Sequence, residues 1–355
     1  MFTPIKIRSH VARNRLWVSP MCQYSALDGV PQQWHLVHLG SFAVGGAGLV
    51  MAEATAVVPE GRISPGCAGI WNDEQADMWA TIASFIEAQG SLPAIQLAHA
   101  GRKASTRVLW EPDGSVPVED GGWSTVAPSS TPYGDYAVPR ALTTAELDDV
   151  VSAFVDAAVR AETAGFSVVE IHAAHGYLLH EFLSPLSNLR SDSYGGPFEN
   201  RVRLLLEVVD AVRAAISEGT GLFVRLSATD WVEGGWTVEE TARLTPLLEA
   251  RGVDLIDISS AGLDPRQQIQ IRPGYQVELA AEIRKAAAGP VSAVGLLTTP
   301  REFEDVLQLG HADVVFAGRE FLRDRMLPMR AALELQQRAE WPQQYVMAKF
   351  PGSIP

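Results

Sequence analysis

Two histidines and a tyrosine lie close together in the segment "IHAAHGYLLHEFLSP". His172 and His175 are three residues apart, and Tyr177 follows two positions later, just after the apolar run "FSVVEI". Histidine is the commonest metal ligand, but a catalytic zinc needs a third protein ligand, and neither Glu170 nor Glu181 has an obvious geometry for that role. A polar loop without chemistry is a second interpretation. The spacing favours two donors aimed at a substrate oxygen, with the Tyr177 phenol as a candidate acid, so no metal is expected.

Further candidate residues lie where other apolar runs end. Gly295 follows one such run, and Gly318 and Arg319 follow another, each just before a stretch of helical period. In many parallel barrels these two turns bind phosphate through backbone N–H groups, and an arginine adds a charged fork. Tight turns without a ligand are the alternative, and the spacing favours phosphate binding.

Arg225 stands inside the apolar run "LFVRLSA". A buried guanidinium needs an acceptor, because desolvating a charge without one is costly. A neighbouring Asp or Glu would satisfy it, and so would an electron-rich ring or carbonyl of a ligand. The residues alone leave both possibilities open.

Eight short apolar runs, each followed by a stretch of helical period, must position these residues. They cover residues 15–20, 48–57, 92–100, 166–174, 222–228, 254–262, 290–296 and 312–319. Continuous apolar runs are typical of parallel strands buried on both faces. Asn72, Thr143, Thr237 and Thr299 precede helical stretches and are predicted N-caps. The strict alternation predicts an α/β fold, a closed (β/α)8 TIM barrel.

An open doubly wound sheet is the alternative fold. That fold usually carries G-x-G-x-x-G after its first strand, where this chain has "SPMCQYS". No strongly biased linker divides the chain, so residues 1–355 are predicted to form a single barrel domain. Residues at about 101–140 are predicted to form a loop insertion over the barrel mouth, and residues at about 340–355 a C-terminal tail.

The composition argues against several classes of function. A net charge of −14 disfavours nucleic acid and anionic membranes as partners. The only cysteines, Cys22 and Cys67, are too few for a four-cysteine iron–sulfur or zinc site. The first residues, "MFTPIKIRSHVARNR", lack the apolar core of a signal peptide, and no apolar run reaches the roughly 18 residues of a membrane span. A cytoplasmic protein is expected.

Several of these motifs occur together along the predicted strands. They are "SPMCQYS", "EATAV", "IQLAHAGRK", "FVRLSA", "VFAGREFLRD" and the long stretch that begins "GFSVVEIHAAHGYLLHEFLSP". From about residue 4 to residue 324, the chain resembles the Old Yellow Enzyme family of FMN-dependent ene-reductases. The "SPMC" cysteine and the short N-terminus resemble its thermophilic-like branch, which contains the xenobiotic reductases.

The resemblance implies an NADPH dehydrogenase that holds FMN over the barrel mouth and receives hydride from NADPH or NADH. The hydride then passes to the β-carbon of an alkene activated by a carbonyl or nitro group. By the same resemblance, the residues that border the isoalloxazine or contact its edge are Ser19, Pro20, Met21, Cys22, Ala54 and Gln96. Arg225 would lie near N1 and C2=O of the ring, and the FMN phosphate would be held by Gly295, Gly318 and Arg319.

The resemblance also gives roles to the histidine–tyrosine segment. His172 and His175 match the pair that hydrogen-bonds the substrate oxygen, a role worth about 3 kcal/mol per donor in other systems. Tyr177 matches the proton donor to the α-carbon, and Tyr24 a tyrosine on the substrate side. Cys22 would tune the flavin potential.

Small activated alkenes are the partners that the resemblance implies, in a homodimer or homotetramer. Members of this branch often complete a neighbouring subunit's site with a C-terminal arginine or aromatic residue. Here no arginine follows Tyr345, and Lys349 and Phe350 are the nearest substitutes.

Two other interpretations, one of which includes a non-catalytic binding protein, fit the sequence less well. The larger relatives that act on dienoyl-CoA or amines carry an iron–sulfur cluster, for which two cysteines do not suffice. A barrel that binds a phosphorylated molecule without redox chemistry is the other alternative. A Schiff-base aldolase needs a lysine at a strand end, and none of the eight predicted strands supplies one.

Overall fold

Eight parallel strands form a closed barrel in the computed structural model, which describes residues 1–351. Around the barrel they follow the order β10-β11-β12-β3-β4-β5-β8-β9. The strands are β3 (Leu16–Val18), β4 (Leu49–Ala56), β5 (Leu92–Ala98), β8 (Val168–Ala173), β9 (Gly221–Ser227), β10 (Leu255–Ser259), β11 (Val291–Ala293) and β12 (Val314–Ala317). Each apolar run identified in the sequence overlaps one of these strands, so the predicted (β/α)8 barrel is confirmed.

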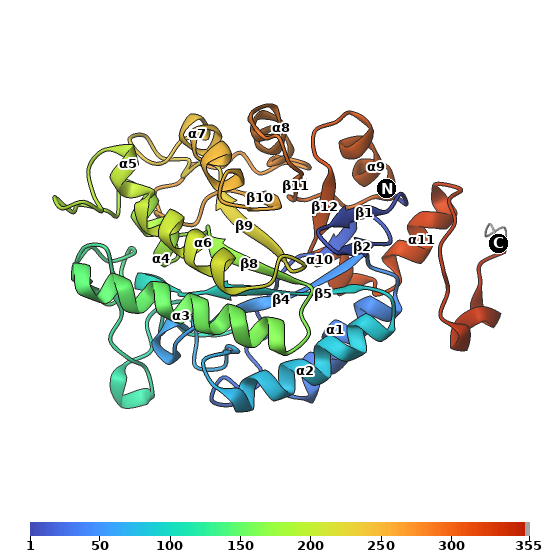
Figure 1. The fold of residues 1–355 in the computed structure, drawn as a ribbon, viewed down its shortest axis with the longest axis horizontal. Coiled ribbons are helices and arrows are strands. Elements are labelled where there is room, and N and C mark those ends of the chain that lie inside the picture. Colours follow the sequence, from blue (N-terminus) through green and yellow to red (C-terminus); the bar gives the residue numbers. More distant parts are fainter. Residues whose placement is uncertain (352–355) are drawn as a thin grey trace.

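Helices surround the barrel strands (Figure 1). They are α1 (Gln33–Val44), α2 (Asp73–Ala88), α3 (Thr144–Thr163), α4 (Leu178–Leu183), α5 (Phe198–Arg201), α6 (Arg203–Ala215), α7 (Val238–Glu249), α8 (Val277–Ala286), α9 (Pro300–Gln308), α10 (Arg319–Arg323) and α11 (Leu327–Glu334). Asn72, Thr143, Thr237 and Thr299 each accept a backbone N–H from the first turn of α2, α3, α7 and α9, as predicted. Within residues 1–351, no helix combines the length and the apolar character that a bilayer crossing needs.

The amino end of the barrel is filled by apolar side chains. Trp17 stacks on Phe223 with ring centroids 6.0 Å apart and meets Phe316 edge-on at 5.5 Å. An antiparallel pair, β1 (Ile5–Ile7) and β2 (His10–Ala12), adds Ile7 and Ala12 to the same buried cluster. Because apolar packing occupies this end, the polar side chains of the strands gather at the carboxyl end.

One irregularity interrupts the pairing of β4 with β5. Ala52 pairs with Ile95 and Ala54 pairs with Gln96, so Glu53 is an extra residue on β4. Such a β-bulge re-aims the side chain of the inserted residue, and bulges are common beside active sites. The shift also sets Ala54 directly beside Gln96.

Residues 101–140 carry little regular structure. They contain 3-10 turns at Gly101–Lys103 and Val118–Asp120, and the short strand β6 (Val126–Ala127) pairs parallel with β7 (Arg140–Ala141). Arg102 Nη2 donates a 2.7 Å hydrogen bond to the carbonyl of Leu263, which follows β10. The segment therefore contacts a loop at the carboxyl end of the barrel.

The chain that follows α11 runs away from the barrel, at the right of Figure 1. It contains a 3-10 turn at Gln343–Ala348, and Phe350 meets Trp341 edge-on with ring centroids 5.5 Å apart. Both aromatic residues belong to the predicted tail, whose last residues, 352–355, lie outside the described part of the chain.

Candidate active site at the carboxyl end of the barrel

His172, His175 and Tyr177 meet at the end of β8 and in the loop that follows it. The ring centroids of His172 and His175 are 5.1 Å apart, and the Tyr177 ring lies 5.0 Å from that of His172. Both pairs meet edge to face, and His172 pairs in register with Arg225 of β9. The structure thus brings together the three side chains that the spacing singled out.

These three groups are uncharged at neutral pH. Burial, and after it the Arg225 guanidinium, lowers the pKa of His172 and of His175 well below the usual value of an imidazole. His172 Nδ1 accepts a backbone N–H at 3.3 Å, so the single ring proton lies on Nε2. The Ser259 hydroxyl lies 2.7 Å from His175 Nε2 and orients that ring. Burial raises the pKa of Tyr177 well above that of a free phenol, so its hydroxyl keeps its proton.

A left-handed turn and a lysine hold this loop in place. His175 and Gly176 adopt φ values of +59° and +73°. A Cβ at Gly176 would lie 2.2 Å from the carbonyl oxygen of Gly262, so the position requires glycine. Lys103 Nζ donates to the carbonyls of His175 and Gly262, both at 2.8 Å. The ammonium also lies 5.2 Å from the centroid of the Tyr177 ring, and burial lowers the pKa of Lys103 to about 8.

The ion-pair partner of Arg225 lies on the neighbouring strand. Arg225 Nε is 3.2 Å from Asp257 Oδ2, and the two residues are register partners on β9 and β10. Asp257 also accepts the hydroxyl of Ser292. On the other side of Arg225, Gln96 Nε2 donates at 2.7 Å to Glu170, and burial raises the pKa of Glu170 to about 8. An acidic partner is therefore present, and the same guanidinium lines the cavity described next.

A cavity of about 350 Å³ opens beside these residues. Seven of the sequence-predicted residues line it: Ser19, Met21, His175, Arg225, Gly295, Gly318 and Arg319. The turns after β11 and β12 meet there, and Arg323 adds a guanidinium to that of Arg319. Arg323 is ion-paired with Glu320, which also lines the cavity, so Arg319 is the arginine that suits an anion such as a phosphate. The other predicted residues, Pro20, Cys22, Tyr24, Ala54, Gln96, His172 and Tyr177, do not line this cavity.

Comparison with known proteins decides the family. Residues 1–338 match the NADH:flavin oxidoreductase / NADH oxidase family. An NADPH dehydrogenase of Bacillus pumilus is 45% identical over 348 residues, which cover 97% of this chain and 98% of the relative. The chain belongs to the Old Yellow Enzyme family.

Solved structures agree with this membership. The Old Yellow Enzyme homologue from Zymomonas mobilis superposes with a TM-score of 0.78 at 30% identity, covering 99% of this chain and 98% of that protein. A 2-naphthoyl-CoA reductase complex gives a TM-score of 0.85 at 27% identity over 95% of this chain, which spans only 52% of that protein. The chain is therefore an FMN-dependent NAD(P)H oxidoreductase of the Old Yellow Enzyme family.

The residues at the cavity fit the flavin that this family uses. Ser19 Oγ is buried and, within residues 1–351, has no hydrogen-bond partner, so it is available to a polar atom of a ligand. Arg225 lines the same space, and Arg319 adds positive charge. A buried polar atom without a partner costs free energy, which a bound heteroatom would recover. An FMN with its phosphate near Arg319 and its ring toward Arg225 would match this distribution.

Cys22 and Tyr24 lie in the loop after β3. Tyr24 adopts φ of +52° and packs edge-on against Trp110 of the inserted segment, with ring centroids 5.6 Å apart. Burial raises the pKa of Tyr24. Cys22 is partly exposed, and the neighbouring Cys67 thiol, together with burial, raises the pKa of the Cys22 thiol well above the usual value. Both side chains therefore keep their protons at neutral pH.

Three residues of the site were not identified from the sequence. Lys103 lies within the quoted motif "IQLAHAGRK", and Asp257 is the one charged residue in the apolar run "LIDIS". Arg323 follows Arg319 within "VFAGREFLRD". A charged residue inside an apolar run or a few residues after one was the available signal, but its partner depends on which strands are neighbours.

Proposed function

We propose that this chain is an ene-reductase, which reduces the C=C bond of alkenes activated by a carbonyl or nitro group, with NADPH or NADH as the electron donor. Bound FMN supplies the hydride. The observation that carries the proposal is the cluster of two neutral histidines and a protonated tyrosine at the end of β8, beside the cavity that suits the flavin.

In this proposal His172 and His175 bind the carbonyl or nitro oxygen of the substrate. Their N–H groups withdraw electron density from the alkene and stabilise the negative charge that the oxygen gains, by about 3 kcal/mol per donor. His172 donates from Nε2, because its Nδ1 already accepts a backbone N–H. His175 donates from Nδ1 when Ser259 donates its hydroxyl proton to Nε2.

Tyr177 delivers the proton to the α-carbon. Its raised pKa keeps the phenol protonated until a strongly basic carbon forms beside it. The Lys103 ammonium, 5.2 Å from the ring centroid, stabilises the phenolate that remains. Tyr24, packed against Trp110, forms the opposite side of the substrate pocket.

The cofactor contacts follow from the same proposal. With FMN bound, Arg225 would stabilise negative charge on its ring, and Cys22 would tune the flavin potential. The residues that border the ring or its edge are Ser19, Pro20, Met21, Cys22, Ala54 and Gln96. The phosphate is held by Gly295, Gly318 and Arg319, which share the cavity rim with Arg323.

We further propose a cytoplasmic homodimer or homotetramer in which each chain forms one barrel domain. Its partners are small activated alkenes, and neither nucleic acid nor a membrane is involved. The segment with Lys349 and Phe350 extends away from its own barrel, which supports a role at the neighbouring subunit's site in place of an arginine (Figure 1).

His172→Ala and His175→Ala test the proposal. Each variant is expected to retain FMN and its yellow colour, while kcat for cyclohexenone falls about 100-fold because one oxyanion donor is lost. Binding of a phenol, followed by its charge-transfer absorbance with the flavin, weakens in parallel. Stopped-flow reduction with NADPH and with NADH shows which nucleotide is preferred.

His311→Ala is the matched control, because His311 is a partly exposed imidazole in the segment before β12. It should leave both readouts unchanged. Wild-type rates of cyclohexenone reduction in both of the other histidine variants would refute the assigned roles. Protein that takes up no FMN would refute the function itself.

A further inference from the structure

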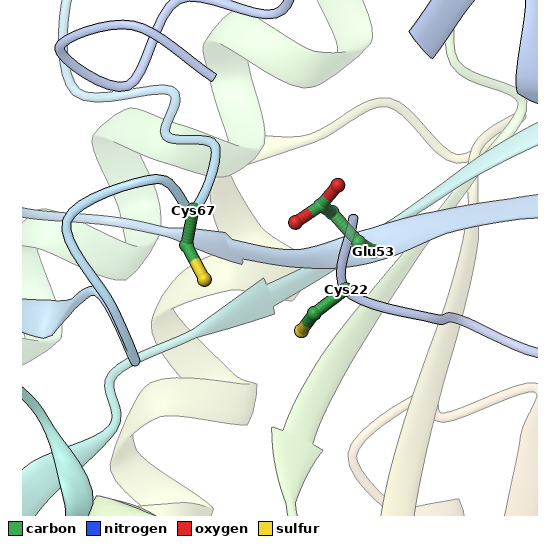
Figure 2. A group of neighbouring side chains, drawn as sticks. All are labelled: Cys22, Glu53 and Cys67. Carbon is green, nitrogen blue, oxygen red and sulfur yellow. The ribbon is translucent and has the colours of Figure 1, made fainter. Parts of the chain in front are cut away.

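A second cluster of reactive side chains lies outside the cavity. The Sγ atoms of Cys22 and Cys67 and a carboxylate oxygen of Glu53 all lie within 4.8 Å of one another. Figure 2 shows the two thiols and the carboxylate pointing into a common space. The three residues come from the loop after β3, the bulge in β4 and the loop after the 3-10 turn at Pro59–Gly61.

The surroundings of Glu53 leave one of its oxygens free. Oε1 accepts the N–H of Gln23 at 3.2 Å, and His35 Nε2 also lies 3.2 Å from it. His35 Nδ1 accepts the N–H of Gln32, so the ring proton is on Nε2, which lies near the carboxylate without forming a hydrogen bond to it. Oε2, by contrast, is buried and has no hydrogen-bond partner within residues 1–351. The Glu53 residue is only 2% exposed, so this oxygen is shielded from bulk solvent.

We propose that Cys22, Cys67 and Glu53 bind one thiophilic divalent cation of the Zn²⁺ class per chain. Two thiolates and a carboxylate are ligands that zinc uses, and three protein ligands leave a fourth position for water. With Zn–S bonds of about 2.3 Å, a tetrahedral site needs ligand atoms a little under 4 Å apart, which small side-chain rotations supply. Binding forms two metal–sulfur bonds and one metal–oxygen bond and releases one proton from each thiol, without oxidation or reduction.

His35 has the place of an outer-shell partner in this site. An imidazole N–H that faces a ligating carboxylate orients it and is a common feature of metal sites. The β-bulge contributes as well, because Glu53 is the inserted residue whose side chain it re-aims. The sequence excluded a four-cysteine site but gave no sign of this one, since its ligands approach one another only in the fold.

Bound metal would also affect the flavin chemistry. Cys22 is one of the residues that the proposed function places beside FMN, so a cation on its sulfur should slow flavin reduction by NADPH. This consequence rests on the proposed function, whereas cation binding itself does not.

The test uses the FMN-loaded enzyme with its thiols reduced. EDTA removes any bound metal, the EDTA is then removed, and Cd²⁺ is added as the probe. Equilibrium dialysis counts bound Cd²⁺, and the ultraviolet thiolate-to-cadmium absorbance reports the sulfur ligands. One ion per chain with two thiolate ligands is expected. Cys67→Ser should lose half of the absorbance. Loss of an outer-shell partner weakens metal binding roughly 10–100-fold, and loss of this direct ligand should weaken Cd²⁺ binding by more than that.

Two further variants and a check of folding make the test decisive. Retained FMN and an unchanged circular dichroism spectrum would show that Cys67→Ser is folded. If Cys67→Ser does not fold, Cd²⁺ binding by Glu53→Gln, which keeps the shape of the side chain, tests the site instead. His10→Ala, which removes a partly exposed imidazole, should bind Cd²⁺ like the wild type. No tight Cd²⁺ binding by the wild type, or undiminished binding by both ligand variants, overturns the site. Stoichiometric binding that leaves the rate of flavin reduction unchanged supports the site and counts against the proposed place of Cys22 at the flavin.

Discussion

Lys103→Met removes the side chain that ties the His175 loop in place and that lies over the Tyr177 ring. The Lys103 ammonium donates to the carbonyls of His175 and Gly262 and so joins the loops that follow β5, β8 and β10. The methionine side chain is similar in length to that of lysine and has a similar apolar stem, but it has no N–H group to donate. The substitution therefore removes the tie and leaves the histidines, the tyrosine and the cavity residues in the chain.

The magnitude follows from the two hydrogen bonds. Each bond from a charged donor contributes about 1.5–3 kcal/mol. Both bonds are only partly buried, so water can reach the released carbonyls, and the free energy of unfolding should fall by the lower sum, about 3 kcal/mol. The left-handed His175–Gly176 turn then loses a support, and a misplacement of about 1 Å at a catalytic group can cost roughly 100-fold in rate.

The assay compares Lys103→Met with Arg107→Met, an exposed position on the same segment. We expect the first variant to retain FMN, to unfold at a lower temperature, and to lose about 100-fold in kcat for cyclohexenone, measured well below its midpoint of unfolding. Phenol affinity should weaken with kcat, because both depend on the position of His175. If Lys103→Met unfolds earlier but binds phenol and turns over like Arg107→Met, the lysine is structural only and the reasoning is refuted.

Two further predictions concern titratable groups near the same loop. Tyr177→Phe should slow alkene reduction by about 100- to 10,000-fold, the range for loss of a general acid. Flavin reduction by NADPH, followed by stopped-flow, should keep its rate. Equal slowing of both half-reactions would contradict the role of Tyr177 as the proton donor. Glu170→Gln should flatten the pH dependence of stability between pH 4.5 and 8. The pKa of Glu170 rises to about 8 in the folded state, so the native protein binds more protons there and the wild type loses stability as pH rises through this window. Thermal melts of both proteins from pH 5 to 8 check this, and parallel curves would argue against it.

Much of the fold could be predicted from the sequence because local signals and the global fold agree. Apolar runs mark all eight barrel strands, and at four helices a polar cap three residues before a Glu or Gln gives a capping box. The cluster of His172, His175 and Tyr177 was also accessible, since six neighbouring positions at one strand end cannot lie far apart. The spacing did not show the protonation state of the two histidines. Both imidazoles are neutral because of their burial and the nearby charge of Arg225, which only the fold reveals.

The contacts that could not be predicted all cross between strands. Asp257 faces Arg225 only because β9 and β10 are neighbours in a particular register. Lys103 reaches two carbonyls on loops that follow other strands, and Cys67 approaches Cys22 across the end of β4. A linear sequence shows the residue types at such places but not the register or the bulge that brings them together.

The buried layer around Arg225 explains how a guanidinium can serve a ligand while it is paired with an acid. Asp257 balances its charge, and Glu170, which lies beside Asp257, would make the layer net negative if it were ionised. Burial and the charge of Asp257 raise the pKa of Glu170 to about 8, so at neutral pH this carboxyl is protonated and the layer is close to neutral. A neutral layer leaves the guanidinium free to attract electron density in the cavity, whereas a negative layer would repel an anionic ligand there. The raised pKa of Glu170 is thus as much a part of the electrostatics of this site as Arg225 itself.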